Sequence, residues 1–166
     1  MTRRFAGVAE LAAAAGDDLG HSEWHQVSQQ DVDRFAALTG DRQWIHVDPD
    51  RAATGPFGTT IAHGYYLLSM LTVLLGEIFE ITGVGMVLNT GVDAVRFIQP
   101  VPVGSAIRAA ARLATVQVGR RGVARLAIDV MIFADGKPDP VCTTTVHSLV
   151  RPPLQLARAQ LARAGS

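Results

Sequence analysis

The feature that most restricts the fold is a long apolar segment, residues 61–81, in which polar side chains are few. Apolar residues on nearly every side, rather than on alternate positions, predict a helix that is buried over most of its surface. Its most apolar part, residues 61–75, contains His63, Ser69 and Thr72. It is therefore too short and too polar to cross a membrane. The rest of the chain has to surround this helix.

After residue 85 the pattern changes to one typical of strands. Residues 86–98 are rich in β-branched side chains, and residues 106–118 and 125–132 place apolar residues at every second position. Residues 141–150 form a further strand, and "GRRG" and "ADGKPDP" supply the turns. Alternation with a period of two buries one face of each strand. One apolar helix followed by four antiparallel strands predicts an α+β fold with the sheet wrapped around the helix.

The composition limits the class of partner. The 166 residues fit one domain that is large enough to bury a core, and 15 basic side chains balance 15 acidic ones. This neutrality gives no support to a nucleic-acid partner or an anionic membrane surface. The N-terminus lacks the continuous apolar core of a secretory signal, because Glu10 interrupts it. We therefore expect a cytoplasmic protein.

Two helix starts frame a short polar loop. Ser28 and Asp31 have the spacing of a capping box, and the helix that they begin is expected to end at Gly40. Asp48 as an N-cap and Pro49 at the first helical position predict one further helical turn. The loop between these helices carries the most polar chemistry of the chain.

Both ends of the chain are rich in alanine. Residues 5–15 are expected to form a short helix, which Gly16 and Gly20 would end. The tail, residues 154–166, fits either a short amphipathic helix or a frayed end. Apart from these alanine-rich ends, the sequence contains no internal repeat or low-complexity linker.

Asp41 and His46 lie together in the loop, beside Trp44 and Ile45. A carboxylate and an imidazole that meet at one water can share its deprotonation and return a proton to a substrate. Histidine suits this role because its ordinary pKa is close to neutrality. The spacing alone also fits a solvated aspartate in a turn and a histidine bonded to a backbone carbonyl. Both interpretations stay open at this point.

His63 and Gly64 fall in the first turn of the expected buried helix. Backbone N–H groups there lack intrahelical partners, so the turn can bind an anion or a developing oxyanion. Because Gly64 has no side chain, another group can approach its backbone closely. The alternative is that Gly64 only relieves packing and that His63 is a core histidine.

Other kinds of active site have weaker support. A metal site built from Asp41, His46, Asp48 and His63 lacks two histidines four positions apart and any Cys/His cluster, so we predict no metal. The single cysteine, Cys142, excludes an intramolecular disulfide and sits in mid-strand, where a small buried residue is ordinary. There is no G-x-S-x-G, G-x-G-x-x-G or P-loop motif.

Three sequence blocks together resemble one family. "FAALTGDRQWIHVDPDRA", residues 35–52, resembles the signature of the (R)-specific enoyl-CoA hydratases, also called MaoC-like dehydratases. "IAHGYYLLSML" and "VRFIQPVPVGSAIRAAARL" resemble the second and third blocks, so the resemblance covers about residues 20–150. It is to the actinobacterial members related to nodulation protein N. The usual Asn-Pro of the signature is replaced by Gln43-Trp44. The positions that match the first block are Phe35, Gly40, Asp41, Ile45, His46 and Ala52.

The resemblance implies a hot-dog fold formed by one domain over residues 1–166, with its core at about residues 20–150 and short N- and C-terminal extensions. It implies a homodimer in which two copies form a continuous sheet. It also implies a hydro-lyase of fatty acid metabolism that adds water to trans-2-enoyl thioesters to give (R)-3-hydroxyacyl thioesters, or runs the reverse dehydration. Coenzyme A would be part of the substrate, and no cofactor or metal is expected.

The family also suggests roles for the site residues. Asp41 and His46 would activate the water. Gly64 would polarise the thioester carbonyl through its N–H, with His63 beside it in the turn that forms the oxyanion and substrate-binding site. Ser69 and Thr72 would line the acyl pocket.

Two rival functions remain. A hot-dog thioesterase commonly has a carboxylate on the central helix, whereas residues 64–75 have none and Glu77 comes late. A hot-dog protein that binds acyl thioesters without catalysis is compatible with the departure at Gln43-Trp44.

Overall fold

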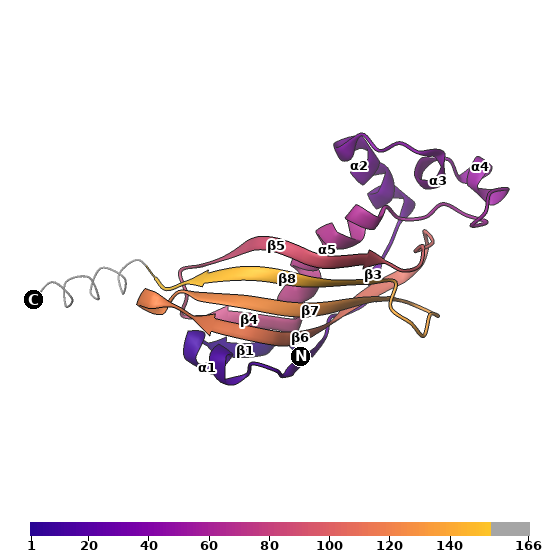
Figure 1. Ribbon diagram of the computed structural model, residues 1–166. Helices are drawn as coiled ribbons and strands as arrows, with labels where there is room; N and C mark the ends of the chain where they lie inside the picture. The colour runs from indigo at the N-terminus through magenta and orange to yellow at the C-terminus, as the bar shows by residue number, and fades with distance from the viewer. Residues whose placement is uncertain (154–166) are drawn as a thin grey trace, which may run out of the picture.

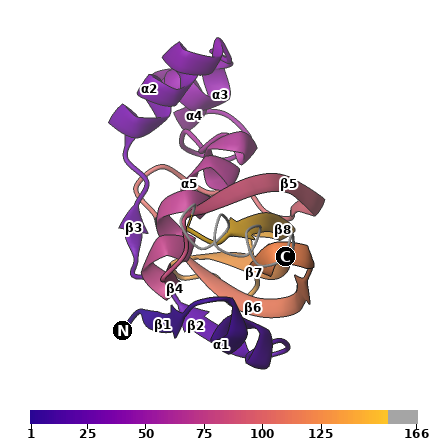
Figure 2. The same ribbon diagram turned by 90° about the vertical axis from the view of Figure 1, so that its left-hand side faces the viewer.

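The computed structural model describes residues 1–153, and the helix or frayed end expected at residues 154–166 lies outside the described residues. An antiparallel sheet curves around one long helix, α5, as Figures 1 and 2 show. The strand order is β2-β6-β7-β8-β5, and the short β3 also pairs with β6. The expected α+β fold with a sheet around a central helix is confirmed. The elements are β1 (Arg3–Ala6), α1 (Val8–Ala13), β2 (Asp18–His21), β3 (His25–Gln26), α2 (Gln29–Thr39), α3 (Trp44–Val47), α4 (Pro49–Ala53), α5 (Gly64–Ile78), β4 (Phe79–Thr82), β5 (Met86–Phe97), β6 (Ala106–Val118), a 3-10 turn (Arg120–Gly122), β7 (Ala124–Ala134) and β8 (Cys142–Arg151).

The central helix is shorter than the apolar segment that predicts it. It covers Gly64–Ile78, and the following residues form β4, which pairs in parallel with β1. The expectation of a helix through residue 81 was wrong at this end, because a continuous apolar run does not distinguish a buried helix from a short strand. Among the described residues, no helix is long and apolar enough to span a membrane.

Three of the four expected strands bury one face, as their alternation predicts. The inward residues of β6, β7 and β8 pack on α5 and form most of the core. The sequence did not reveal β2 and β3, which extend this sheet beyond β6, because strands of four and two residues are too short to show a period. The buried residues of β6 and β7 include Ile107, Ala109, Ala111, Leu113, Leu126, Ile128, Val130 and Ile132.

β5 differs from the other long strands because it forms an edge of the sheet. It pairs with β8 on one side only, and nearly all of its residues are exposed. Val87, Leu88, Val92 and Phe97 each expose 44–47% of their surface. The expectation that one face is buried was therefore wrong for β5 within a single chain.

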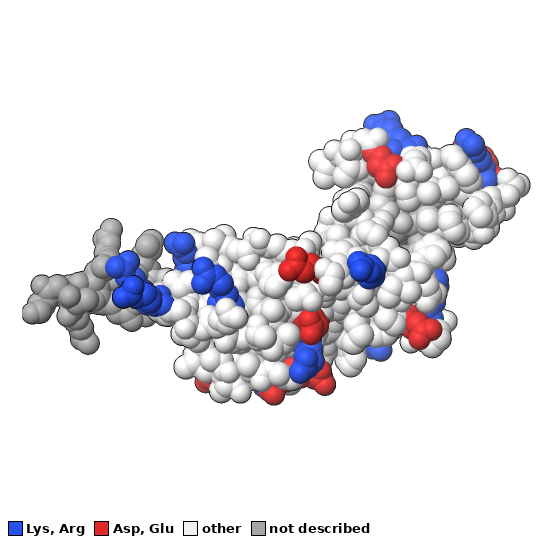
Figure 3. Space-filling view, in the orientation of Figure 1, with Lys and Arg blue, Asp and Glu red and all other residues white. Residues whose placement is uncertain are grey.

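Helices α2, α3 and α4 project beyond one end of the sheet, over the start of α5, and we call this unit the overhang (residues 29–53) (Figures 1 and 2). As predicted, the Ser28 side chain accepts from the Asp31 N–H and α2 ends at Gly40, whose φ is 81°. Asp48 likewise accepts from the Arg51 N–H at the start of α4. The predicted N-terminal helix exists as the shorter α1. On the face drawn in Figure 3, acidic and basic side chains are mixed, except at the left-hand end, where basic ones predominate.

Candidate active site

Asp41 follows directly on the left-handed cap of α2, so the end of that helix fixes where its backbone lies. Its side chain is partly exposed, and Oδ1 accepts a long bond of 3.4 Å from the Gln43 N–H. Its backbone carbonyl accepts a hydrogen bond of 3.0 Å from Nε2 of His63. The backbone of Asp41 is therefore anchored, while its carboxylate keeps most of its capacity to accept hydrogen bonds.

His46 lies on α3, where the sequence suggested only a loop, and its side chain is 6% exposed. Its Nδ1–H donates to the Ile61 carbonyl at 2.7 Å, and because a carbonyl can only accept, the proton is on Nδ1. Burial lowers the pKa of His46; His63 lowers it further, while the Ile61 carbonyl and Asp41 oppose the change. The imidazole is thus held neutral, with Nε2 free as a base.

His63 is the N-cap residue of α5 and stacks on His46, with ring centroids 3.8 Å apart and planes at 24°. Its Nε2–H donates to the Asp41 carbonyl, so the ring touches both members of the acid/base pair. Nδ1 of His63 is buried and has no partner among the described residues. The sequence placed His63 in this turn but did not show this contact between the two histidines.

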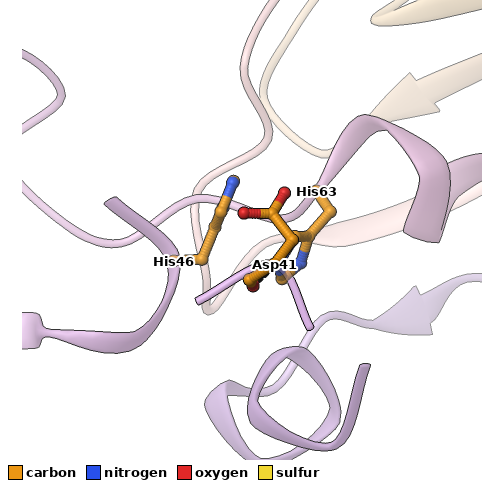
Figure 4. A group of neighbouring side chains, drawn as sticks. All are labelled: Asp41, His46 and His63. Carbon is orange, nitrogen blue, oxygen red and sulfur yellow. Dashed lines mark hydrogen bonds between the residues drawn. The ribbon is translucent and has the colours of Figure 1, made fainter. Parts of the chain in front are cut away.

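Asp41, His46 and His63 each offer a polar atom, and the three atoms lie within 4.8 Å of one another (Figure 4). The lone pairs of two stacked rings lie in nearly parallel planes, whereas a metal ion needs ligand lone pairs that converge at about 2 Å. The arrangement suits a water held between a carboxylate and an imidazole. The absence of a metal from the reaction stays a prediction.

Gly64 is the first residue of α5, and its N–H has no intrahelical partner or side-chain cap. A methyl group at this position would lie 2.9 Å from carbons of the Phe97 ring. A groove of about 240 Å³ is lined by both residues and by His46, Ile61 and Leu67. The sequence did not point to Phe97, which comes from the distant end of β5. Close packing on Phe97 explains the glycine, and the free N–H at the groove is compatible with the oxyanion role.

Ser69 does not join this group. Its side chain is exposed, and its hydroxyl donates to the Tyr65 carbonyl one turn earlier, at 2.9 Å. Thr72 instead lines a mostly apolar cavity of about 490 Å³ between α5 and the strands β5 and β8, together with Leu75 and Val87. Of the residues expected at the site, the structure brings together Asp41, His46, His63 and Gly64. The roles assigned to them stay predictions.

Gln43-Trp44, the departure from the usual signature, leaves polar atoms of Asp41 and His46 within 4.8 Å of each other. The Trp44 ring packs beside Gly55, where a methyl group would lie 2.9 Å from it, and Arg51 stacks over it at 4.5 Å. Gln29 holds the next turn by donating to the His46 carbonyl at 2.8 Å. The Trp44 ring is therefore packed between Gly55 and Arg51. The role of Gln29 was not visible in the sequence.

Comparisons with known proteins agree with this geometry. Residues 10–130 match the model of the MaoC like domain. The chain is 45% identical over 149 residues to 3-hydroxyacyl-thioester dehydratase Z of Mycobacterium tuberculosis, covering 90% of this chain and 97% of that one. It is 36% identical over 149 residues to nodulation protein N of Rhizobium leguminosarum bv. viciae, covering 87% and 91%.

Solved structures show the same architecture. A monoamine oxidase regulatory protein from Archaeoglobus superposes with a TM-score of 0.73 at 24% identity, covering 92% of this chain and 98% of that one. An (R)-hydratase from A. caviae superposes with a TM-score of 0.61 at 27% identity, covering 84% and 96%. The sheet around α5 is thus the hot-dog fold of hydratases and dehydratases. The chain belongs to the MaoC-like dehydratase family, as the three sequence blocks indicated.

Proposed function

We propose that this protein, a member of a family of hydro-lyases, is an (R)-specific enoyl-CoA hydratase that adds water across the C2–C3 bond of trans-2-enoyl thioesters, or removes it in reverse. The observation that carries this proposal is the contact group of Asp41 and a neutral His46. Nδ1 of His46 is occupied by the Ile61 carbonyl at 2.7 Å, so only Nε2 is available to take a proton. This group matches what activation of a water requires.

In the proposed reaction, His46 and Asp41 hold one water. Nε2 of His46 takes a proton as the water oxygen bonds to C3, and the C2–C3 electron pair moves toward the thioester to give an enolate. The Gly64 N–H stabilises the developing negative charge on the thioester oxygen. A proton from the acid/base pair then bonds to C2, so that one water has been added and the site is restored.

The acyl chain has a suitable cavity beneath the sheet. The cavity of about 490 Å³ is lined mainly by apolar residues of α5 and β5, with Thr72 among its few polar groups. Apolar walls favour an alkyl chain, because burying it removes apolar surface from water. Coenzyme A is part of the substrate in this proposal, and no further cofactor takes part.

We also propose a homodimer formed through β5. An edge strand of 12 residues leaves a row of backbone N–H and C=O groups unpaired, and the apolar side chains of β5 are half exposed. A second copy that pairs antiparallel along β5 would satisfy both. The continuous sheet would then carry one acid/base group on each side of the interface.

A thioesterase mechanism is less well supported, because the carboxylate of Glu77 is already bonded. It accepts from Nε2 of His25 at 2.9 Å and from the Glu23 N–H at 3.1 Å. It therefore joins α5 to β3 at the end of the helix opposite Gly64. A protein that binds acyl thioesters without catalysis remains the alternative that the experiment has to exclude.

The test follows the loss of enoyl-thioester absorbance with crotonyl-CoA and longer trans-2-enoyl-CoAs, with product chirality determined. Asp41→Asn and His46→Gln should each lower the rate by at least about 100-fold. Asp50→Asn and His21→Gln, which change the same residue types at exposed positions, should leave it unchanged. Free thiol in place of hydration would indicate a thioesterase. Binding without turnover would indicate a non-catalytic protein.

A further inference from the structure

Four exposed arginines gather at the end of the sheet farthest from the overhang, and we call them the arginine end: Arg120, Arg121, Arg125 and Arg151. Several other arginines are paired with acids, such as Arg112 with Asp129 and Arg4 with Glu80. None of the four forms an ion pair with an acid among residues 1–153. The turn between β6 and β7 and the end of β8 lie at the left-hand end in Figure 1, and basic side chains predominate at that end in Figure 3. This end has an uncompensated positive charge in a chain that is neutral overall.

The strand register places these arginines side by side. Arg125 is paired with Leu149 on β8, two residues before Arg151. The turn that carries Arg120 and Arg121 ends at Gly122, where an added Cβ would lie 3.8 Å from the Pro152 ring. The cluster therefore comes from adjacent strands and their connecting turn, which the sheet holds in place.

Within one copy, the arginine end is far from the acid/base group. β5 begins at Met86, which is paired with Arg151, and ends at Phe97, which packs on Gly64. Its 12 residues separate the two ends by about 40 Å. A substrate held at His46 does not reach its own copy's arginine end along the sheet.

Antiparallel pairing of β5 with β5 of a second copy reverses this relation. The first residue of one strand then lies next to the last residue of the other, so the arginine end of one copy meets the Gly64 end of its partner. Strands are about 4.8 Å apart, which places Arg151 on β8 about 10 Å, and Arg125 on β7 about 15 Å, to the side of the other copy's β5.

We propose that the arginine end binds the phosphate groups of the thioester substrate whose acyl part reacts at the acid/base group of the other copy. This inference rests on the proposed function and on the β5 dimer. Arginine suits the role because its guanidinium is always charged and binds phosphate oxygens through two N–H groups. The pantetheine arm of coenzyme A, which separates the thioester from the phosphates, would cross the interface. Each site is incomplete without its partner.

The first experiment compares two substrates that differ only beyond the arm. Crotonyl-CoA carries the phosphates, and crotonyl-pantetheine carries the same enoyl thioester and arm without them. The variant Arg121→Gln/Arg125→Gln/Arg151→Gln should raise KM for crotonyl-CoA about tenfold or more and leave kcat/KM for the truncated thioester unchanged. The matched control Arg4→Gln/Arg34→Gln/Arg112→Gln removes the same charge from exposed, paired arginines and should change neither value.

The second experiment tests whether the arginines act across the interface. Chains with Asp41→Asn and chains with the triple arginine substitution are co-expressed with different tags, and the mixed dimer is purified. One of its sites lacks the aspartate, whereas the other combines an intact Asp41 with the arginines of the Asp41→Asn chain. We expect that site to turn over crotonyl-CoA with the KM of the unsubstituted protein. A KM that stays raised in the mixed dimer would overturn the arrangement.

The outcomes separate the two proposals. Turnover of the truncated thioester with no effect of the arginine substitutions on crotonyl-CoA leaves the hydratase intact and refutes the phosphate site. An equal loss with both substrates also refutes it, because the substitutions then act on folding or chemistry. Failure of the unsubstituted protein to hydrate crotonyl-CoA or any longer trans-2-enoyl-CoA refutes the proposed function itself, and 3′,5′-ADP binding by calorimetry then decides the arginine end. Binding that the triple variant lacks supports it, and no binding overturns it.

Discussion

Substitutions at Gly64 can distinguish its two possible roles, which are close packing on Phe97 and donation of its N–H to the thioester oxygen. A Cβ at residue 64 would lie 2.9 Å from Cδ2 and Cε2 of Phe97. Carbon atoms pack best at about 3.5–4.0 Å, so the ring has to retreat by at least about 0.6 Å. Within one copy Phe97 is 46% exposed, so its ring has room to move away from residue 64. Overpacking costs about 1–3 kcal/mol, and alanine regains up to about 1 kcal/mol of helix propensity, so we expect Gly64→Ala to lower the free energy of unfolding by about 0–3 kcal/mol.

The activity of paired variants identifies the role. Phe97→Ala removes the clash, so Gly64→Ala/Phe97→Ala should match Phe97→Ala in thermal stability and in kcat/KM for crotonyl-CoA. The third variant is Gly64→Pro/Phe97→Ala. Proline is compatible with the first helical position, and His63, with φ −64° and ψ 142°, has the conformation that a following proline requires. This variant lacks only the N–H donor, and kcat should fall by about 100-fold or more. Equal kcat in the alanine and proline double variants would refute the oxyanion role of Gly64.

Three further predictions concern single residues. Burial lowers the pKa of His46 below its ordinary value of 6.5. The contribution of the neutral imidazole to stability is therefore complete above about pH 6.5 and is lost as the pH falls through the lower pKa of the folded state. Tm should fall more steeply on acidification for the unsubstituted protein than for His46→Gln, and parallel curves would contradict this. Burial raises the pKa of the Cys142 thiol to about 11, so iodoacetamide at about pH 8 should label Cys142 only after unfolding, as mass spectrometry would show. His63→Phe keeps a ring against His46 but removes the bond to the Asp41 carbonyl, so kcat should fall by roughly 10- to 100-fold with little change in KM, and an unchanged kcat would mean that this bond does not position Asp41.

Much of the fold follows from local patterns. Ser28, Gly40 and Asp48 mark helix ends by hydrogen bonds to neighbouring backbone, and such bonds depend only on adjacent sequence. The alternation in β6 and β7 similarly identifies the buried face. The short β2 and β3 and the division between α5 and β4 depend on tertiary pairing, which local sequence does not encode.

The site shows the same division between local and distant information. Asp41 and His46 could be paired from the sequence because one short loop carries both. The stacking of His63, the bond from Gln29 and the approach of Phe97 to Gly64 each join positions that are distant in the chain. Ser69 was assigned to the pocket from its helix alone, and the direction of its side chain, toward solvent and the Tyr65 carbonyl, depends on how α5 is rotated in the sheet.

The overhang has a consequence for how such a protein can diversify. The acid/base pair belongs to a small helical unit beyond the end of the sheet, whereas the apolar cavity lies between α5 and β5. Substitutions at Thr72, Leu75 or Val87 can reshape the cavity for a longer, shorter or branched chain without disturbing the bonds that hold His46. Under the proposed function, natural selection or a designer could therefore change which acyl group is accepted while the chemistry at the overhang stays the same.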